Sequence, residues 1–448
     1  MLTTWIQAVY QFLWGDLLRI PLPGGSSFGV SLLIILLIPT GIYFTIRTRF
    51  LPVRLFGDMV RTLTGKKKED GSLSTFQTLI VSTATRVGMG NLVGVVAAVS
   101  AGGAGAVFWM WISAFFGMAV AYMEGVLAQI FKEKKDDEFV GGLPFYGRKL
   151  LGNKVWIGVF LSVLYILYAL CCLPAQGFNV VSSVGRMAEI VTGKTIPSGS
   201  AFYYIVGTLI VILTAAIAFG GIKKVSKWTD MMVPVMAVLY FVITLFIIFT
   251  NLGSMPGVFK RIFEEAFGFR QAVAGGFGVV LMNGVKRGLF SNEAGSGSAP
   301  CAAAAAECEN PVQAGLVQAL GVFIDTIVIC SCTAMIMLLV PEDLVAGLSG
   351  MELLQTALRY HLGEFGVIFI AATLFMFSFS TFLGILFYAR SNVAYLFGDN
   401  WLSQTAYKVM ALVMLFAGGL AAYTVVWDLG DVGIGLMTIF NTAILYLL

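Results

Sequence analysis

Long apolar runs, separated by short charged stretches, make up most of the chain from residue 28 to its end. A run of about 20 apolar residues is long enough to cross the hydrocarbon core of a bilayer as a helix. The pattern predicts eleven such spans, at 28–47, 75–100, 106–131, 155–181, 201–219, 228–251, 271–290, 313–340, 365–389, 406–423 and 432–448. The composition, 58% hydrophobic and 12% charged, supports the same class, an all-α integral membrane protein.

The basic residues predict how these spans are oriented. Most of the 28 Lys and Arg residues fall in the loops after the first, third and fifth spans, and Lys286 and Arg287 are counted on the same side. Short loops rich in Lys and Arg stay in the cytoplasm. We therefore expect a multi-pass protein of the cell membrane, in contact with lipid, with its N-terminus outside and its C-terminus in the cytoplasm. Residues 1–27 are aromatic and amphipathic, which is typical of an interfacial segment.

The second span contains the stretch STATRVGMGNLVG, in which glycines, an amide and a charge interrupt the apolar run. Gly88 and Gly90 each weaken a helix by about 1 kcal/mol relative to alanine. Asn91 and Arg86 bring polar groups to a depth where unpaired ones cost several kcal/mol each. The stretch therefore predicts a broken helix that faces protein or water. The alternative is a helix that packs closely through its small residues.

A second glycine-rich interruption, AGGFG at residues 274–278, lies in the seventh span. With one extra span at the front, the other ten divide into five plus five, and the two interrupted spans take equivalent places. Matching interruptions in two halves indicate an inverted repeat with a binding site between them. The predicted organisation is an interfacial segment at 1–27, an extra span with its basic loop at 28–72, and five-helix repeats at 73–251 and 252–448.

Broken helices offer free N–H groups to a carboxylate and free carbonyl groups to a cation. The N–H groups are expected near Gly88, Gly90 and Asn91, and the carbonyls near Ala84 and Val87. A sodium ion is coordinated by several oxygen ligands. The ninth span would add the carbonyl of Phe377 and the hydroxyls of Ser380 and Thr381, which share one helix face. The alternative is that these hydroxyls bond back to their own helix.

Other polar groups at membrane depth have two interpretations each. Gln176 could bond a ligand without burying a charge, or join two helices. Phe277 would form an aromatic wall over the site. Asp325 is the natural ion-pair partner of Arg86, although Arg86 could instead hold a substrate carboxylate. The stretch SNEAGSGSAPCAAAAA at residues 291–306 is either a gate helix or a structural turn.

Several motifs resemble one known family. VGMGNLVGV, GGAGAVFWMWISAFFGM, GLFSNEAGSGSAPCAAAAA and NPVQAGLVQALGVFIDT are similar to segments of the alanine/glycine:cation symporter family. The resemblance implies an eleven-span protein with a LeuT-like five-plus-five inverted repeat and two discontinuous helices. It also implies sodium-coupled, in some members proton-coupled, uptake of small neutral amino acids.

The resemblance implies a substrate bound between the second, fourth, seventh and ninth spans. The carboxylate would meet the Gly90 and Asn91 amides, the amino group would face Gln176, and Phe277 would cap the ligand. The sodium ion would lie between the second-span carbonyls and Ser380 with Thr381.

The chain departs from the family pattern near the expected pocket. Met89 stands where the family has Thr or Ser, and Ile385 where it commonly has Trp or Asn. Both residues are expected near the substrate with Gly88 and Thr381. They leave open a neutral amino acid other than alanine or glycine, such as glutamine.

Other function classes find less support in the sequence. An ion channel would need a repeated filter or a ring of charges. An enzyme would need a nucleophile with a base, or metal ligands, and the chain has one histidine, His361. We therefore expect a symporter, not an enzyme, with no cofactor other than co-transported Na⁺. Its partners would be a small neutral amino acid and the bilayer, with no nucleic acid, and it would be a monomer.

Overall fold

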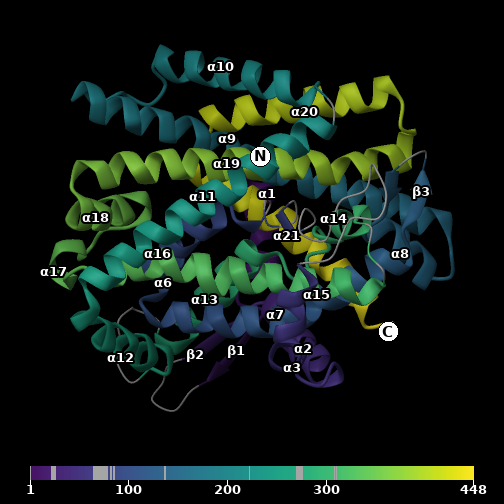
Figure 1. Ribbon diagram of the computed structural model, residues 1–448, viewed down its shortest axis with the longest axis horizontal. Coiled ribbons are helices and arrows are strands. Elements are labelled where there is room, and N and C mark those ends of the chain that lie inside the picture. The colour runs from purple at the N-terminus through teal and green to yellow at the C-terminus, as the bar shows by residue number, and fades with distance from the viewer. Residues whose placement is uncertain are drawn as a thin grey trace.

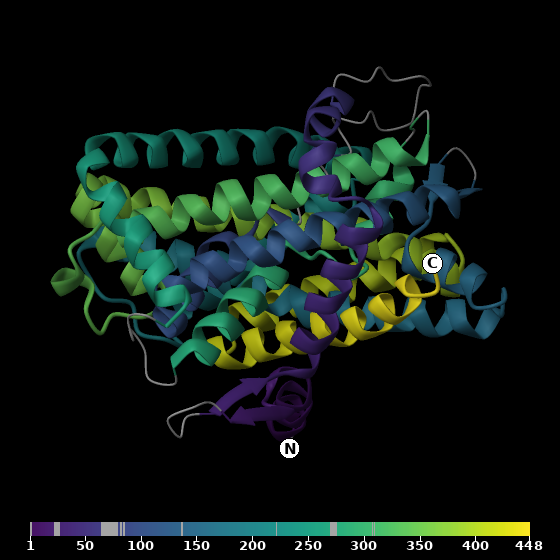
Figure 2. The same cartoon turned by 90° about the horizontal axis from the view of Figure 1, so that it is seen from below.

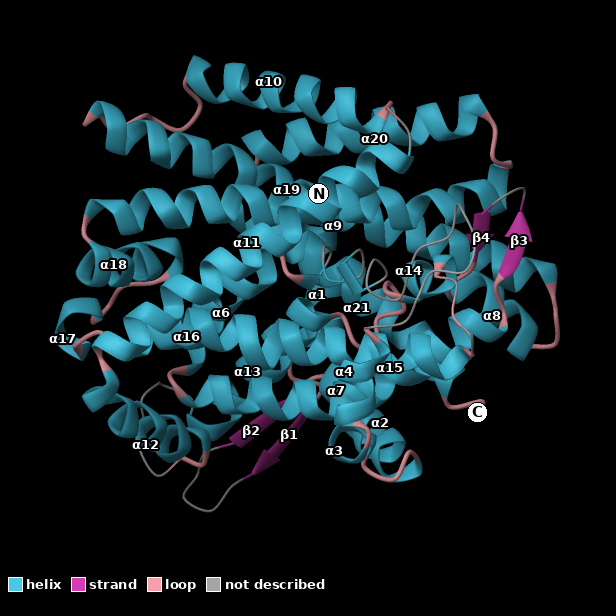
Figure 3. Ribbon diagram, viewed as in Figure 1, coloured by secondary structure: helices cyan, strands magenta, loops and turns pink. Residues whose placement is uncertain are grey.

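The computed structural model describes residues 2–21, 27–63, 79–80, 83, 86–135, 138–220, 222–268, 276–306, 308 and 310–448. The chain is mostly helical, with two short two-stranded ribbons at its periphery (Figure 3). In the first part of the chain the elements are α1 (Leu2–Trp14), β1 (Leu18–Pro21), β2 (Ser27–Val30), α2 (Leu32–Arg47), α3 (Leu51–Arg54), α4 (Phe56–Thr62), the π-helix η1 (Gly90–Gly94), α6 (Val95–Gly102), α7 (Gly105–Ile130), β3 (Glu133–Lys135), β4 (Glu138–Val140), α8 (Leu143–Leu150), α9 (Val155–Thr192), α10 (Ala201–Ala218) and α11 (Ile222–Thr250).

In the second part of the chain, every element of the described residues is a helix. Its elements are η2 (Leu252–Ser254), α12 (Met255–Ala266), α13 (Gly276–Asn292), α14 (Pro300–Ala305), α15 (Pro311–Val322), the π-helix η3 (Phe323–Cys330), α16 (Ser331–Leu338), α17 (Glu342–Val345), α18 (Gly350–Leu362), α19 (Glu364–Phe397), α20 (Trp401–Leu420) and α21 (Tyr423–Leu445).

Seven stretches within the described residues are long and apolar enough to cross a membrane. They are Gly105–Ile130, Val155–Thr192, Ala201–Ala218, Met231–Thr250, Pro311–Leu338, Glu364–Phe397 and Tyr423–Leu445. The segments Leu32–Arg47 and Gly90–Gly102 are apolar but shorter. The chain is therefore a multi-pass membrane protein, and the count of eleven spans stays a prediction.

The helices pack around two centres: α9 and α19 lie against each other, and α7 lies against α13 and α15. Figure 1 shows α10, α19 and α20 running along the longest axis of the molecule. In Figure 2 the N-terminal helix and the β1–β2 ribbon project from one side, and α2 runs across the direction of the other long helices. The first predicted span thus differs in direction from the rest.

The boundary between the last two helices differs from the prediction. Helix α21 begins at Tyr423, so the stretch before residue 432 is helix rather than loop. The sequence suggested a loop because Asp428 and Asp431 interrupt the apolar pattern. Asp431 is buried instead, and its carboxylate lies 2.8 Å from Lys286 Nζ and 3.3 Å from Arg287 Nη1.

Lys286 and Arg287 lie in a different position from the one that the sequence suggested. The loop count put both residues on the cytoplasmic side, but they lie within α13, against α21. Buried Lys and Arg are tolerated where a carboxylate neutralises them. Trp14 of α1 donates a hydrogen bond to the Asp431 carbonyl (3.1 Å), which fastens the N-terminal helix to the same place.

The second span is interrupted where the sequence predicts. The backbone is not helical at Val87 and Gly88, and a π-helical turn follows from Gly90 to Gly94. The Gly88 N–H, freed by the break, donates to Asn91 Oδ1 at 2.8 Å. Asn91 therefore stabilises the interruption from within the same segment.

The seventh span is interrupted later than the sequence suggested. Ala274 lies outside the described residues, and Phe277 and Gly278 lie in the first turn of α13. The non-helical segment is 293–299, between α13 and α14. Glu124 of α7 makes it possible, because its carboxylate accepts from Gly295 N (3.1 Å) and Gly297 N (2.8 Å) and so satisfies two buried N–H groups.

Candidate functional site

A small cavity of about 20 Å³ lies where the two interrupted segments meet α9, α19 and α21. Its lining residues are Arg86, Met89, Gly90, Tyr168, Cys172, Gln176, Phe290, Glu293, Thr381, Ile385 and Ile434. Several of them are apolar, and five carry charged or polar groups on side chains that are largely buried, namely Arg86, Tyr168, Gln176, Glu293 and Thr381. A small enclosed space with a few convergent polar groups is typical of a ligand site.

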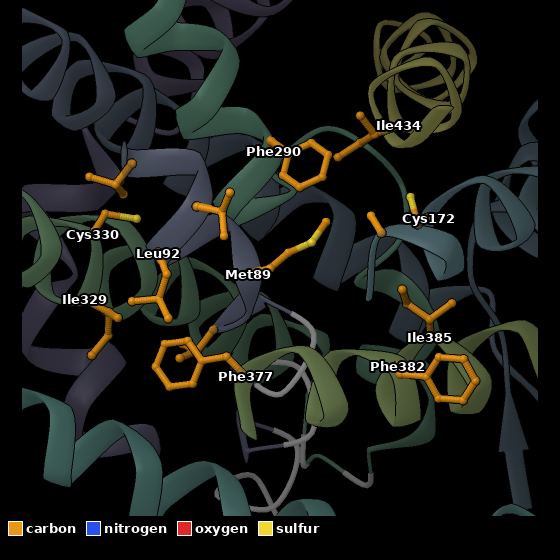
Figure 4. Close-up of a cluster of buried hydrophobic side chains, with 14 of the residues drawn as sticks. Met89, Leu92, Cys172, Phe290, Ile329, Cys330, Phe377, Phe382, Ile385 and Ile434 are labelled. Atoms are coloured by element: carbon orange, nitrogen blue, oxygen red, sulfur yellow. The ribbon is translucent and has the colours of Figure 1, made fainter. Parts of the chain in front are cut away.

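The cavity brings together five residues that the sequence predicted for the substrate. Met89 and Gly90 come from the second-span interruption, Gln176 from α9, and Thr381 and Ile385 from α19. These residues are separated by up to about 300 positions in the chain, so only the fold joins them. In Figure 4 the Met89 side chain extends toward Phe290 and Cys172, and Ile385 lies beyond.

Three other predicted substrate residues lie elsewhere. The Gly88 N–H is occupied by Asn91, and the Asn91 amide donates to Asp325 Oδ1 (2.8 Å) and to the Asp325 carbonyl (3.1 Å). Phe277 packs its ring against Trp109, with 5.7 Å between centroids, and is not among the cavity residues. The phenylalanine that lines the cavity is Phe290, near the other end of the same helix.

The two interrupted segments approach each other closely at Gly90. A Cβ atom at this position would lie 2.9 Å from Ser291 Cα, which is closer than real Cβ contacts. A larger residue at position 90 would therefore push a backbone away. Glycine is required here by the packing of the two segments rather than by an unusual backbone angle.

The two long helices each present one face to the cavity. Tyr168, Cys172 and Gln176 follow one another at four-residue spacing on α9, and Thr381 and Ile385 do so on α19. The Gln176 carbonyl oxygen is buried without a hydrogen-bond partner in the described part of the chain. It is thus a free acceptor at the edge of the cavity.

Five cavity residues were not predicted from the sequence: Tyr168, Cys172, Phe290, Glu293 and Ile434. The four-residue spacing before Gln176 was a signal for the first two. For Phe290 and Glu293 the signal was the glycine- and serine-rich run that follows them, since an acid beside such a run at membrane depth indicates a second interruption. Nothing local distinguishes Ile434 from other apolar residues of its span.

Three of the five predicted sodium ligands, those on α19, lie close together. Ser380 Oγ lies 3.0 Å and Thr381 Oγ1 2.9 Å from the Phe377 carbonyl oxygen, so three oxygens lie together on α19. Both hydroxyls donate to that carbonyl, which is the back-bonding that the sequence left open. Each hydroxyl keeps lone pairs that a cation could use. Val87 is buried, and Ala84 lies outside the described residues.

Arg86 and Asp325 do not form an ion pair within the described part of the chain. Arg86 Nη1 donates to the Gln318 carbonyl at 3.2 Å. Asp325 accepts instead from Asn91, Ser291 Oγ (2.8 Å) and Thr326 Oγ1 (2.7 Å). Neutral donors satisfy the carboxylate here, because both interrupted segments place polar side chains next to it.

The chain is similar to known transporter proteins over nearly its whole length. Residues 24–448 match the model of the sodium:alanine symporter family. The chain is 37% identical to the amino-acid carrier protein AlsT of Bacillus subtilis, covering 97% of this chain and 90% of that protein. It is 41% identical to the probable sodium/glutamine symporter GlnT of the same organism, covering 93% of this chain and 85% of that protein.

Among solved structures, the chain is similar to MhsT in complex with L-phenylalanine. The TM-score is 0.61 at 14% identity, over 84% of this chain and 89% of that one. This likeness shows a shared LeuT-like transporter fold and nothing about the ligand. The match to the family model over nearly the whole chain, together with two relatives above 30% identity, shows that the chain belongs to the sodium:alanine symporter family.

Proposed function

We propose that the protein is a secondary transporter that carries a small neutral amino acid into the cell together with Na⁺. The observation that carries the proposal is the cavity that joins Met89 and Gly90 to Gln176, Thr381 and Ile385. Two interrupted helices that meet at such a cavity are typical of transporters that bind an ion and a substrate together. Family membership supports the same class of activity.

Sodium would bind beside the amino acid, on the oxygens of Phe377, Ser380 and Thr381. Carbonyl oxygens near Val87 and Ala84 would complete the ligand set from the second-span interruption. Thr381 also lines the cavity, so one side chain would touch both ligands. Since binding of either ligand would order this region, each would favour binding of the other. Proton coupling is the alternative.

The substrate would be an amino acid of the alanine or glycine type, or a larger neutral one such as glutamine. Family membership favours the former, and the name of the relative GlnT favours the latter. Met89 and Ile385 decide between them in this proposal, because both line the cavity and neither offers a strong hydrogen-bonding group. Asn179 Nδ2 lies 3.0 Å from Met89 Sδ and holds that side chain in place.

Eleven spans in two inverted repeats, 73–251 and 252–448, remain our proposal for the architecture, after an interfacial segment at 1–27 and an extra span in 28–72. In this division, corresponding positions of the two repeats would hold the two interrupted segments. They also hold the long helices α9 and α19, each preceded by a short helix, α8 or α18. Cysteine-accessibility labelling of intact cells tests the orientation: a cysteine near residue 5 should react from outside and one near residue 66 only from inside.

The cluster around Asp431 would close the outer side of the cavity. Phe290 lines the cavity and its ring lies 5.0 Å from that of Trp427, with the Arg287 guanidinium 5.2 Å from the Trp427 ring. Opening toward the outside would separate α13 from α21 and break the pairs with Asp431. Closure would follow ligand binding, because Phe290 belongs to both the cavity and this cluster.

Uptake into proteoliposomes tests the proposal. An inward sodium gradient should drive uptake of radiolabelled glycine, L-alanine or L-glutamine, and replacing sodium by potassium should abolish it. Uptake driven equally well by a proton gradient without sodium would overturn the ion assignment. No uptake of any neutral amino acid under either gradient would overturn the proposed function.

A further inference from the structure

We propose that Glu293 binds the ammonium group of the transported amino acid and is the charged residue that selects zwitterions. The inference rests on the proposed function, because it assigns a role within the same cavity. Glu293 lies directly after α13, at the start of the non-helical segment 293–299. It lines the cavity and is 6% exposed.

The Glu293 carboxylate is held by neutral hydroxyls. Tyr168 donates to Oε1 at 3.2 Å, and Ser298 Oγ donates to Oε2 at 2.5 Å. No Lys or Arg nitrogen of the described residues lies within ion-pair distance of it. A buried carboxylate without a cationic partner is costly. A cation that enters the cavity would remove that cost.

Glu124 provides a contrast within the same region. Its carboxylate accepts from two backbone N–H groups and from Asn441 Nδ2 (2.7 Å), and it is not among the cavity residues. These three hydrogen bonds give the Glu124 carboxylate a structural role, since it satisfies three buried donors. The bonds of Glu293 to two hydroxyls do not, because a neutral acceptor would serve them as well.

The backbone at Glu293 adds an independent observation. Its φ is 54°, in the left-handed region that favours glycine and asparagine and costs a glutamate about 1 kcal/mol or more. Strained residues of this kind are concentrated at functional sites. The strain turns the chain out of α13 exactly one residue after Asn292, so that the Glu293 side chain reaches the cavity.

Gln176 supplies a second acceptor for the same ligand group. Its Oε1 is buried, has no partner among the described residues and belongs to the lining of the same cavity. An ammonium group carries three N–H donors and no acceptor. One carboxylate oxygen of Glu293 and the Gln176 oxygen would take two of them.

The balance of charge points in the same direction. Arg86 acts electrostatically on the carboxylates of Glu124, Glu293 and Asp325, so one guanidinium faces three acids. The guanidinium itself donates from Nη1 to the Gln318 carbonyl (3.2 Å), and its Nε and Nη2 atoms have no hydrogen-bond partner among the described residues. The charge of Arg86 is therefore shared among three acids, and none of the three has Arg86 as a hydrogen-bond partner within the described residues.

The test compares ligand-induced stabilisation of the purified full-length protein and of two variants in NaCl. Glu293→Gln keeps the size of the side chain and an oxygen for Tyr168 and Ser298. Glu293→Asp keeps the charge but moves it back, and aspartate is well tolerated at positive φ. The probes are glycine, L-alanine and L-glutamine, with propionate as the partner of L-alanine that lacks the ammonium group. The readout is the concentration of probe that gives half of the maximal rise in unfolding temperature.

The wild type should be stabilised by at least one amino acid and not by propionate. Glu293→Gln should raise the half-maximal amino-acid concentration at least tenfold at saturating sodium, and Glu293→Asp should raise it by less. An unchanged concentration in both variants would overturn the inference. So would a variant that needs more sodium but no more amino acid, because Glu293 would then hold the coupling cation. A wild type that no amino acid stabilises would overturn the proposed function itself.

Discussion

In the second span, the N–H freed by the interruption is bonded by a neutral amide, the side chain of Asn91, three residues away. In the seventh span, the N–H groups of Gly295 and Gly297 are bonded by a carboxylate, Glu124, more than 170 residues away. The first interruption is stabilised from within its own segment and the second by another helix. A local partner can be found in the sequence, whereas a distant one requires the fold.

The largest expected effect comes from the distant partner. Glu124→Ala leaves the N–H groups of Gly295 and Gly297 and the Asn441 amide without an acceptor inside the protein. Each donor left without an acceptor costs about 1–3 kcal/mol. Removing a buried carboxylate offsets part of this cost, so we expect a loss of about 4 kcal/mol in unfolding free energy. Denaturant titration of the purified protein measures it. Glu124→Gln, which keeps one acceptor oxygen, is the matched control and should lose less; equal stability of all three proteins would contradict this role.

Asn91→Ala removes the local partner. The Gly88 N–H loses its acceptor and Asp325 loses a donor, so we expect a loss of about 2–3 kcal/mol, smaller than for Glu124. Asn179→Ala is the control, because its side chain bonds the Ala175 carbonyl of its own helix and Met89 Sδ. The control should lose about 1 kcal/mol at most. An equal loss of unfolding free energy in Asn179→Ala and Asn91→Ala would contradict the role of Asn91.

Gly90→Ala tests the contact between the two interrupted segments. The added Cβ would meet the Ser291 backbone at 2.9 Å, so the segments must separate, at about 1–2 kcal/mol. Gly94, in the same π-helical turn, has nothing within 4 Å of an added Cβ. Gly94→Ala should therefore be neutral or slightly stabilising. Thermal unfolding and sodium-driven uptake of both variants provide the comparison, and similar behaviour of the two would argue against close packing at Gly90.

The smallest effect is expected away from both interruptions. Burial lowers the pKa of His361 in α18, against a smaller opposing contribution from its hydrogen bond to the Ile336 carbonyl (3.0 Å). The unfolded chain therefore binds the proton more readily. Above pH 6.5, the ordinary pKa of histidine, His361 is neutral in both states and does not lower the unfolding free energy. Below that pH the unfolding free energy should fall, because the unfolded chain takes up the proton first. His361→Gln should flatten unfolding temperature between pH 7 and 5 relative to the wild type, and an identical slope would exclude this contribution.

The sequence predicted the first interruption well, for a physical reason. Gly88, Gly90 and Asn91 stand out in an apolar run, and the group that satisfies the break is one of them. The face of α19 with Thr381 and Ile385 was also visible, because helical spacing alone puts them together. The chemistry of these segments is local.

The seventh span shows the limit of that approach. Two glycine-rich stretches, 274–278 and 294–298, compete within about 20 residues, and both could interrupt a helix. Only the carboxylate of Glu124 decides between them, since it satisfies the N–H groups of the later one. The position of Phe277 followed from the wrong choice. The same holds for Asp431, whose charge suggested a loop until the fold supplied Lys286 and Arg287.

A structure of the protein with Na⁺ and the amino acid that it binds most tightly would show directly whether the substrate lies between the two interrupted segments. We expect density for the amino acid between the two interrupted segments, in contact with Gly90 and Gln176, with Na⁺ next to Thr381. Density for the amino acid at any other place, with the space between Gly90 and Glu293 closed by side chains, would contradict it.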